Sequence, residues 1–237
     1  MSDYGLLVKN NIGGIQIDST YRNLSLDEFG TGVTVTNNNN VDSYWTRIAI
    51  TASPLVPIIL VQPNTDYFIT VPAYHKTGSN FDGADMVTVA THSTSIGWKS
   101  YRENRVASGD NYGLLVYNPG EDLCFDSGKN YFKIHSVHSI TIGAPSDRYS
   151  DYGPYEDISH SGISDPYYIL SPSSFWLLAD DPPIVSPLRA YYIGIKKLTS
   201  TSVRVGWFAR TILGSPVDYT INDGNNPTMK LIVCDVT

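Results

Sequence analysis

The five histidines are the side chains of this sequence best suited to metal binding or proton transfer. His135 and His138 lie three residues apart. On a strand this spacing directs the side chains to opposite faces, so the pair would chelate a metal poorly. His75, His92 and His160 have no such neighbour in the sequence. We therefore interpret all five as surface or hydrogen-bonded histidines rather than as metal ligands.

Other motifs for catalysis or cofactor binding are absent or incomplete. The sequence contains no G-x-S-x-G nucleophile elbow, no H-E-x-x-H zinc motif, no phosphate-binding loop and no dinucleotide fingerprint. Asn80–Asp85 (NFDGAD) offers oxygens to calcium but lacks the full ligand ladder. Glycoside cleavage requires a pair of closely placed carboxylates, and no such pair stands out among the 23 Asp and Glu residues. We expect no catalytic residue, no metal and no cofactor, and a polysaccharide-cleaving enzyme remains only a third alternative.

One sixteen-residue segment occurs twice. YGLLVKNNIGGIQIDS begins at Tyr4, and YGLLVYNPGEDLCFDS begins at Tyr112, 108 positions later. The alternation of apolar residues and the central Asn, Gly and Pro predict a hairpin in each copy, with its turn at Asn118–Asp122 in the second. We expect these apolar positions to form the hairpin core: Leu6, Val8, Ile15 and Ile17 in the first copy, and Leu114, Val116, Leu123 and Phe125 in the second.

Each copy ends on an Asp-Ser pair, Asp18-Ser19 and Asp126-Ser127. A catalytic role is one reading. The other is structural, because Asp and Ser side chains at the end of a strand readily accept hydrogen bonds from local backbone amides. The structural reading is favoured.

The similarity continues along the chain in the same order. PIILVQP at 57–63 matches PYYILSP at 166–172, and STSIGW matches STSVRVGW, so that Trp98 and Trp207 are 109 positions apart. This indicates a tandem duplication. We expect both tryptophans to pack in a core, with a sugar-stacking platform as the alternative.

Many short segments of period-two alternation, separated by Gly, Pro and Asn, predict an all-β fold. We predict two tandem β-sandwich-like units, 1–108 and 109–237, related by a repeat of about 108 residues. An alternative is that the strand at Tyr112 closes the first unit, as Met229–Asp235 closes the second. The predicted strands are Val33–Thr36, Tyr44–Thr51, Ile58–Gln62, Tyr67–Val71, Met86–Thr91, Ser95–Tyr101, Tyr131–His135, Ser139–Ile142, Tyr167–Leu170, Phe175–Ala179, Ala190–Lys197, Ser202–Arg210 and Met229–Val236.

The stretch with the strongest signal for recognition is 144–168, which is acidic and rich in Tyr, Gly and Pro. We predict a long loop there, because loops of this length are usually functional or disordered and because this composition is typical of adaptable recognition loops. The candidate subunit or ligand contacts are Tyr149, Tyr152, Tyr155 and Tyr167. We also expect Tyr152→Ala to leave folding intact.

Composition narrows the possible partners. The net charge of −7 and the absence of a basic stripe argue against nucleic acid, and no apolar run approaches the roughly 20 residues that span a bilayer. We expect no membrane insertion and no export signal. Cys124 and Cys234 have no metal or redox spacing. Free thiols in a reducing compartment are favoured over a disulfide, although the pairing is left open.

The two openings resemble structural proteins of tailed bacteriophages, those of the tail tip, baseplate or tail fibres. The resemblance rests on "YGL-x-V-x-N", a turn containing Gly, and "DS", carried by Tyr4-Gly5-Leu6-Leu7-Val8, Asn10 and Asp18-Ser19, and by Tyr112-Gly113-Leu114-Leu115-Val116, Asn118 and Asp126-Ser127-Gly128. It implies a virion component of the tail, assembled in the host cytoplasm. Such a protein would form a homo-oligomer and bind other tail proteins. A module that binds a host-surface glycan or receptor is the alternative.

Overall fold

Strands make up all the regular secondary structure in the described part of the chain, so the predicted all-β class is confirmed. The computed structural model describes residues 7–9, 15–18, 23–33, 35–36, 44–88, 95–103, 106–131, 133–143, 152–171, 175–178, 188–212 and 228–236. Within these ranges we find no apolar helix of membrane-spanning length.

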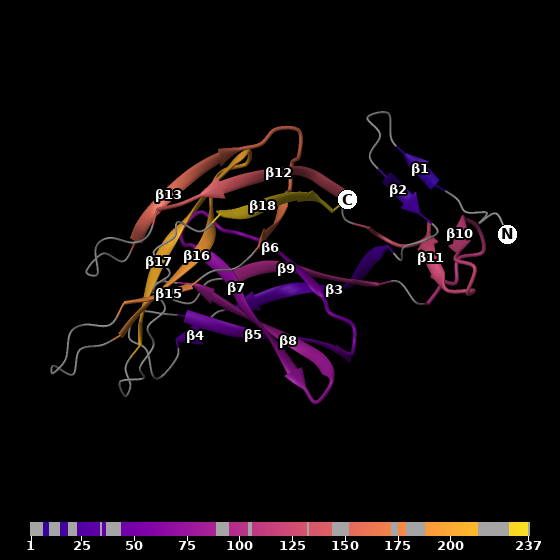
Figure 1. Ribbon diagram of the computed structural model, residues 1–237, viewed down its shortest axis with the longest axis horizontal. Helices are drawn as coiled ribbons and strands as arrows, with labels where there is room; N and C mark the ends of the chain where they lie inside the picture. The colour runs from indigo at the N-terminus through magenta and orange to yellow at the C-terminus, as the bar shows by residue number, and fades with distance from the viewer. Residues whose placement is uncertain are drawn as a thin grey trace.

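The strands follow one another at short intervals (Figure 1). Their bounds are β1 (Leu7–Lys9), β2 (Ile15–Asp18), β3 (Leu24–Val33), β4 (Val35–Thr36), β5 (Tyr44–Ser53), β6 (Ile58–Gln62), β7 (Ile69–Thr77), β8 (Asn80–Thr88), β9 (Ser95–Glu103), β10 (Leu115–Tyr117), β11 (Leu123–Asp126), β12 (Lys133–Thr141), β13 (Tyr152–Ser159), β14 (Tyr167–Ser171), β15 (Phe175–Leu178), β16 (Leu188–Thr199), β17 (Ser202–Ile212) and β18 (Thr228–Asp235).

Most strands belong to two large sheets. The six-stranded sheet has the order β12-β18-β14-β6-β9-β3. The eight-stranded sheet has the order β13-β17-β16-β7-β8-β5-β4, and β15 also pairs with β16. In the six-stranded sheet, β6-β9-β3 run outward from the centre on one side and β14-β18-β12 on the other. In the eight-stranded sheet, β7-β8-β5-β4 lie on one side of the centre and β16-β17-β13 on the other. Each half of the chain therefore contributes one side of both sheets.

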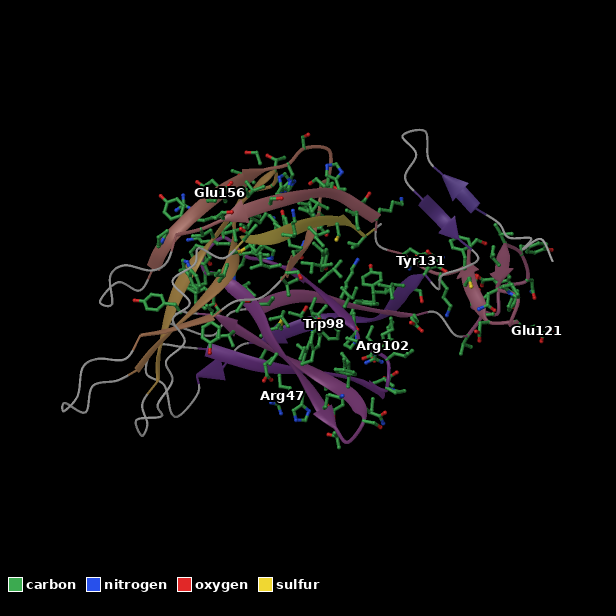
Figure 2. The ribbon with its side chains drawn as sticks, in the orientation of Figure 1. Arg47, Trp98, Arg102, Glu121, Tyr131 and Glu156 are labelled. Carbon is green, nitrogen blue, oxygen red and sulfur yellow. The ribbon has the colours of Figure 1, made fainter. Side chains whose placement is uncertain are left out.

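The two sheets enclose a large hydrophobic core in each half, and two smaller clusters contain residues of both halves. In the first half Ile59 and Trp98 of the six-stranded sheet cluster with Met86 of the eight-stranded sheet, and Figure 2 shows Trp98 among the side chains of this region. In the second half Leu231 clusters with Trp207 from the opposite sheet. Core packing of both tryptophans is thus confirmed, and the indole N–H of Trp207 donates to the carbonyl oxygen of Gly143 at 2.8 Å.

The two halves are continuous with each other through their central strands. Between described residues, β14 meets β6 at Tyr168 and Val61, and β16 meets β7 at Ile195 and Ile69. The sheets therefore run from one half into the other. The boundary between 1–108 and 109–237 stays a prediction.

Several strand predictions are confirmed and others need correction. β6 has the predicted bounds, and β5, β9, β14 and β16 to β18 overlap closely with theirs. The predicted loop at 144–168 is wrong over Tyr152–Ser159, because this segment forms β13 against β17. The segments predicted at Tyr131–His135 and Ser139–Ile142 form one strand, β12, with a bulge. The ten-residue strand β3 was not predicted, apart from its last residue, Val33, which begins the predicted strand Val33–Thr36.

Two small hairpins, β1–β2 and β10–β11, lie together at one end of the molecule, outside the large sheets (Figure 1). Their registers are the same: Leu7 opposes Asp18 as Leu115 opposes Asp126, and both registers shift after the next residue pair, between Val8 and Lys9 and between Val116 and Tyr117. Because β10 pairs only with β11, it does not close the first unit in the described structure, which removes that alternative.

Only part of the predicted hairpin core is buried. Val116 and Leu123 are 6% and 5% exposed, as expected, but Leu114 is 44% exposed. The prediction that Leu114 is a core residue is therefore wrong. Its position precedes β10, where the backbone no longer follows the alternation of the strand. The side chains of Leu6, Val8, Ile15 and Ile17 lie outside the described residues.

Two Leu→Ala substitutions should differ in their effect on stability, because one residue is buried and the other is half exposed. Leu231→Ala removes a side chain that is fully buried between the sheets, so we expect it to lower the free energy of unfolding by about 2–5 kcal/mol. Leu114→Ala should lower it by less than about 1 kcal/mol, since nearly half of that residue already contacts water. Urea unfolding of both variants measures the difference, and equal losses would contradict this assignment of the core.

Candidate functional site

The second hairpin, which we define as Tyr112–Gly128, exposes an unusual number of large apolar side chains. Tyr112 is 93% exposed, Leu114 and Leu115 are each 44% exposed, and Tyr117 is 48% exposed. Contiguous exposed apolar surface on a protein commonly marks a place where another molecule binds. This hairpin is the strongest candidate for an interaction site in the described structure.

The exposed apolar residues continue beyond the hairpin. Ile134 and Val137 on β12 are 59% and 53% exposed, and Val106 before the hairpin is 74% exposed. Seven of the eleven large hydrophobic side chains that the described residues leave exposed lie between Val106 and Val137. β12 is also an edge strand of the six-stranded sheet, and edge strands offer unpaired backbone groups to a partner.

The turn of the second hairpin is held by one side chain. The Asn118 side-chain oxygen accepts hydrogen bonds from the backbone amides of Gly120 and Asp122, both at 2.9 Å. Glu121, with a φ of 62°, lies at the tip of the hairpin, far from the large sheets (Figure 2). The predicted turn at Asn118–Asp122 is confirmed.

The Asp-Ser pair at the end of this hairpin has the structural role that we favoured. One carboxylate oxygen of Asp126 accepts the backbone amide of Ser108 at 2.6 Å, and the other accepts that of Gly128 at 2.8 Å. Burial by itself would raise the pKa of Asp126, but these amide donors outweigh it and the pKa lies below its usual value. The ionised carboxylate therefore joins the hairpin to the segment that precedes it.

In the second copy, a contact between Gly113 and Ser127 accounts for the Gly at the second position of the repeated segment and the Ser at its last position. The Ser127 hydroxyl oxygen accepts the backbone amide of Leu114 at 2.7 Å. Gly113 has a φ of 141°, and a Cβ atom built there would lie 2.5 Å from the same hydroxyl oxygen. The hydrogen bond therefore forms only because residue 113 has no side chain.

The base of the second hairpin is attached to the first half of the chain. Asn23 donates its backbone amide and its side-chain amide to the carbonyl oxygen of Cys124, both at 2.9 Å. Tyr131, labelled at the base of the hairpin in Figure 2, forms a β-bridge with Ser25 at the start of β3. The hairpin is thus held on two sides, while Tyr112, Leu114, Leu115 and Tyr117 stay exposed.

The four predicted contact tyrosines lie in different environments. Tyr149 lies outside the described residues. Tyr152 begins the paired part of β13, opposite Phe208, and its side chain is not described. Tyr167 is only 9% exposed and packs in a cluster with Leu60, so it has almost no surface to offer. Tyr155, at 56% exposed, is the one of the four whose described side chain faces solvent.

Tyr155 is part of a small polar cluster on β13 and β17. The guanidinium carbon of Arg204 lies 3.6 Å from the centre of the Tyr155 ring. Arg204 also donates two hydrogen bonds to the carboxylate of Asp157, at 2.7 and 2.8 Å. The hydrogen bonds from Arg204 lower the pKa of Asp157. Because one guanidinium contacts both residues, the ring of Tyr155 has a defined position on an exposed edge strand.

His160 is a hydrogen-bonded histidine, as predicted. It is 7% exposed, its Nε2 is hydrogen-bonded to the hydroxyl of Tyr168 at 2.6 Å, and its Nδ1 is buried with no partner. Burial lowers the pKa of His160, and the nearby His135 and His138 lower it further. The spacing of these histidines in the sequence does not indicate this cluster, because it forms only when the end of β13 lies near β12 in the fold.

The remaining candidates for ligand chemistry are occupied by partners within the protein. Asp82 of the Asn80–Asp85 segment hydrogen-bonds His75, and Asp85 pairs with Arg47 at 2.8 Å. Among the described residues, no group of three His, Cys, Asp or Glu is arranged to hold a metal ion.

Cys124 and Cys234 are both buried and free, as favoured. Burial raises the pKa of the Cys234 thiol to about 12, so that this thiol stays protonated at neutral pH.

Comparison with known proteins gives no relative: no protein-family model matches the chain, and no curated protein or solved structure shows significant similarity to it.

The link between Gly113 and Ser127 can be tested by a double-mutant cycle. Ser127→Ala should lower the free energy of unfolding by about 0.5–1.5 kcal/mol, because it leaves the Leu114 amide without its acceptor. Gly113→Ala should cost about 1–3 kcal/mol through its positive φ and the close approach to the hydroxyl. The double variant should lose less than the sum, since Ser127→Ala removes the atom that the new Cβ meets. Strict additivity would disprove the contact.

The His160 environment predicts a fall in stability at acidic pH. The folded protein lowers the pKa of His160 below its ordinary value of 6.5, so below that pH the unfolded chain binds more protons than the folded one. We expect the free energy of unfolding to be highest above neutrality and to fall as the pH drops below 6.5. Urea unfolding at about pH 8 and about pH 5 measures this. His160→Gln should be less stable at the higher pH but change less between the two, and an equal change in both proteins would contradict the assignment.

Proposed function

We propose that this protein is a structural component of a bacteriophage tail, at the tip, in the baseplate or where fibres attach. It binds neighbouring subunits through the second hairpin. The observation that carries the proposal is the concentration of exposed apolar side chains on that hairpin, Tyr112, Leu114, Leu115 and Tyr117. Large aromatic and aliphatic residues of this kind contribute much of the binding energy in protein interfaces.

The construction of the hairpin supports an interface rather than a flexible appendage. Its turn, its Asp126 carboxylate and its Ser127 hydroxyl are all engaged in hydrogen bonds, and its base is bonded to Asn23. A hairpin held in this way loses little conformational freedom when a partner binds. The resemblance of both openings to tail proteins supports the choice of assembly, a homo-oligomer joined to other tail proteins and built in the host cytoplasm.

A second candidate function is binding of a host-surface glycan or receptor. The observation that favours it is Tyr155, whose exposed ring is positioned by Arg204 on the edge strand β13. Tyrosine rings on a rigid support offer a stacking surface at low entropic cost.

The second function can be tested with Tyr155→Ala, which should leave self-association intact. If the second function holds, the soluble parent protein should block phage adsorption and the Tyr155→Ala variant should not.

Charge placed in the second hairpin should weaken assembly. The double variant Leu115→Glu/Tyr117→Glu puts two carboxylates where a partner would have to desolvate them, so we expect self-association to weaken by about tenfold or more. Phe29→Glu, at a 72% exposed position on β3, is the matched control and should associate like the parent protein. Sedimentation velocity of the three proteins measures this.

The assignment to the tail has its own test. Antibody against the protein should label the tails of purified particles in negative-stain images. Absence of the protein from purified particles would overturn the tail assignment. Undiminished association of the hairpin variant would overturn the proposed interface.

A further inference from the structure

A cavity of about 480 Å³ lies where the two halves of the chain meet. Its walls come from β6 and β7 of the first half and from β14, β16 and β18 of the second. The second hairpin contributes none of the residues that line it. The cavity is thus distinct from the proposed subunit interface.

The cavity arises from the way the central strands diverge. At one end the halves are joined closely: Val61 pairs with Tyr168, Ile69 pairs with Ile195, and the backbone amide of Lys197 donates to the carbonyl oxygen of Asn64 at 2.9 Å. Beyond these pairs β6 and β14 have no further paired residues, nor have β7 and β16. The space between the diverging strands is the cavity, and it opens beside Val56, which is 59% exposed.

The lining is mostly aliphatic, with Thr70, Tyr74, Tyr168 and Ser171 as the residues that carry hydroxyl groups. Branched side chains such as Ile59, Val71, Leu170 and Ile195 form the walls, and none of the described residues that line the cavity carries a charge. An ionised group inside would lose its hydration without gaining a partner. The volume lies in the range of about 300–1,000 Å³ that is common for small-molecule sites, which are likewise mostly apolar.

The cavity has few polar groups, and some of them already form hydrogen bonds within the protein. The hydroxyl of Tyr74, from the opposite sheet, is hydrogen-bonded by the backbone of Ile59 on β6, which partly offsets the rise that burial causes in the pKa of Tyr74. Ordered water is poorly suited, because each molecule needs two to four polar partners.

We propose that this cavity binds an uncharged apolar small molecule, with an alkyl chain as the chemical class that its aliphatic walls fit best. The ligand enters beside Val56 and Tyr74, and its polar end, where it has one, remains at that opening near Ser171. This inference is independent of the proposed function in the tail.

The probe for the test is N-phenyl-1-naphthylamine, a neutral dye that fluoresces when it leaves water, displaced by 1-decanol. We expect saturable binding of one dye per chain and full displacement by the alcohol. Ser171→Trp and Val71→Trp fill the cavity from opposite walls, so each should weaken dye binding by about tenfold or more. Ser171 is exposed, so its variant should fold even if Val71→Trp does not.

Two controls separate the cavity from the exposed apolar surface. Val106→Trp adds the same side chain at a 74% exposed position and should leave binding unchanged. Leu115→Glu/Tyr117→Glu should also bind the dye normally, because the hairpin does not line the cavity. Absence of saturable binding overturns the proposal. Binding that survives Ser171→Trp overturns it too, as does binding lost in the hairpin variant, which would place the dye on the proposed interface.

Discussion

Both large sheets cross from one half of the chain to the other through a single described residue pair, Val61 with Tyr168 in one sheet and Ile69 with Ile195 in the other. Each half has its own large core, and two smaller clusters hold the halves together: Leu60 and Tyr101 pack with Tyr167 and Cys234, and Phe68 and Val87 pack with Phe208. The cavity lies beside the two paired positions, where the central strands have no further pairing.

The second hairpin follows a different constraint, because it has no sheet to cover it. Its shape depends on local hydrogen bonds that backbone amides donate to the side-chain oxygens of Asn118, Asp126 and Ser127, rather than on a large core. Such a framework leaves the outward-facing residues free of any packing role, and several of them are nonetheless apolar. Apolar residues that the fold does not use and does not bury are most simply explained by a partner, which is why the proposed interface lies here and not on the sandwich.

The resemblance between the two openings was informative about structure but not about chemistry. It predicted the hairpins and their turn, and the structural role of the Asp-Ser pair is confirmed at Asp126 and Ser127. It also suggested that Leu114 was a core residue, which is wrong. The Tyr-rich stretch misled in another way, since its Gly and Pro residues indicated a loop where β13 forms. An edge strand tolerates Pro154, because one side of it has no partner to hydrogen-bond.

The sequence by itself determined the all-β class, most strand positions, and the turn of the second hairpin, because the period of two and the turn residues act over a few neighbouring positions. Only the tertiary structure decided which strands of the two halves meet, that Tyr167 is buried while Tyr155 is exposed, and that His160 lies near His135 and His138. Alternation assigns side chains to two faces of a strand. It does not say which face another part of the chain will cover, since that depends on contacts between strands that are not neighbours in the sequence.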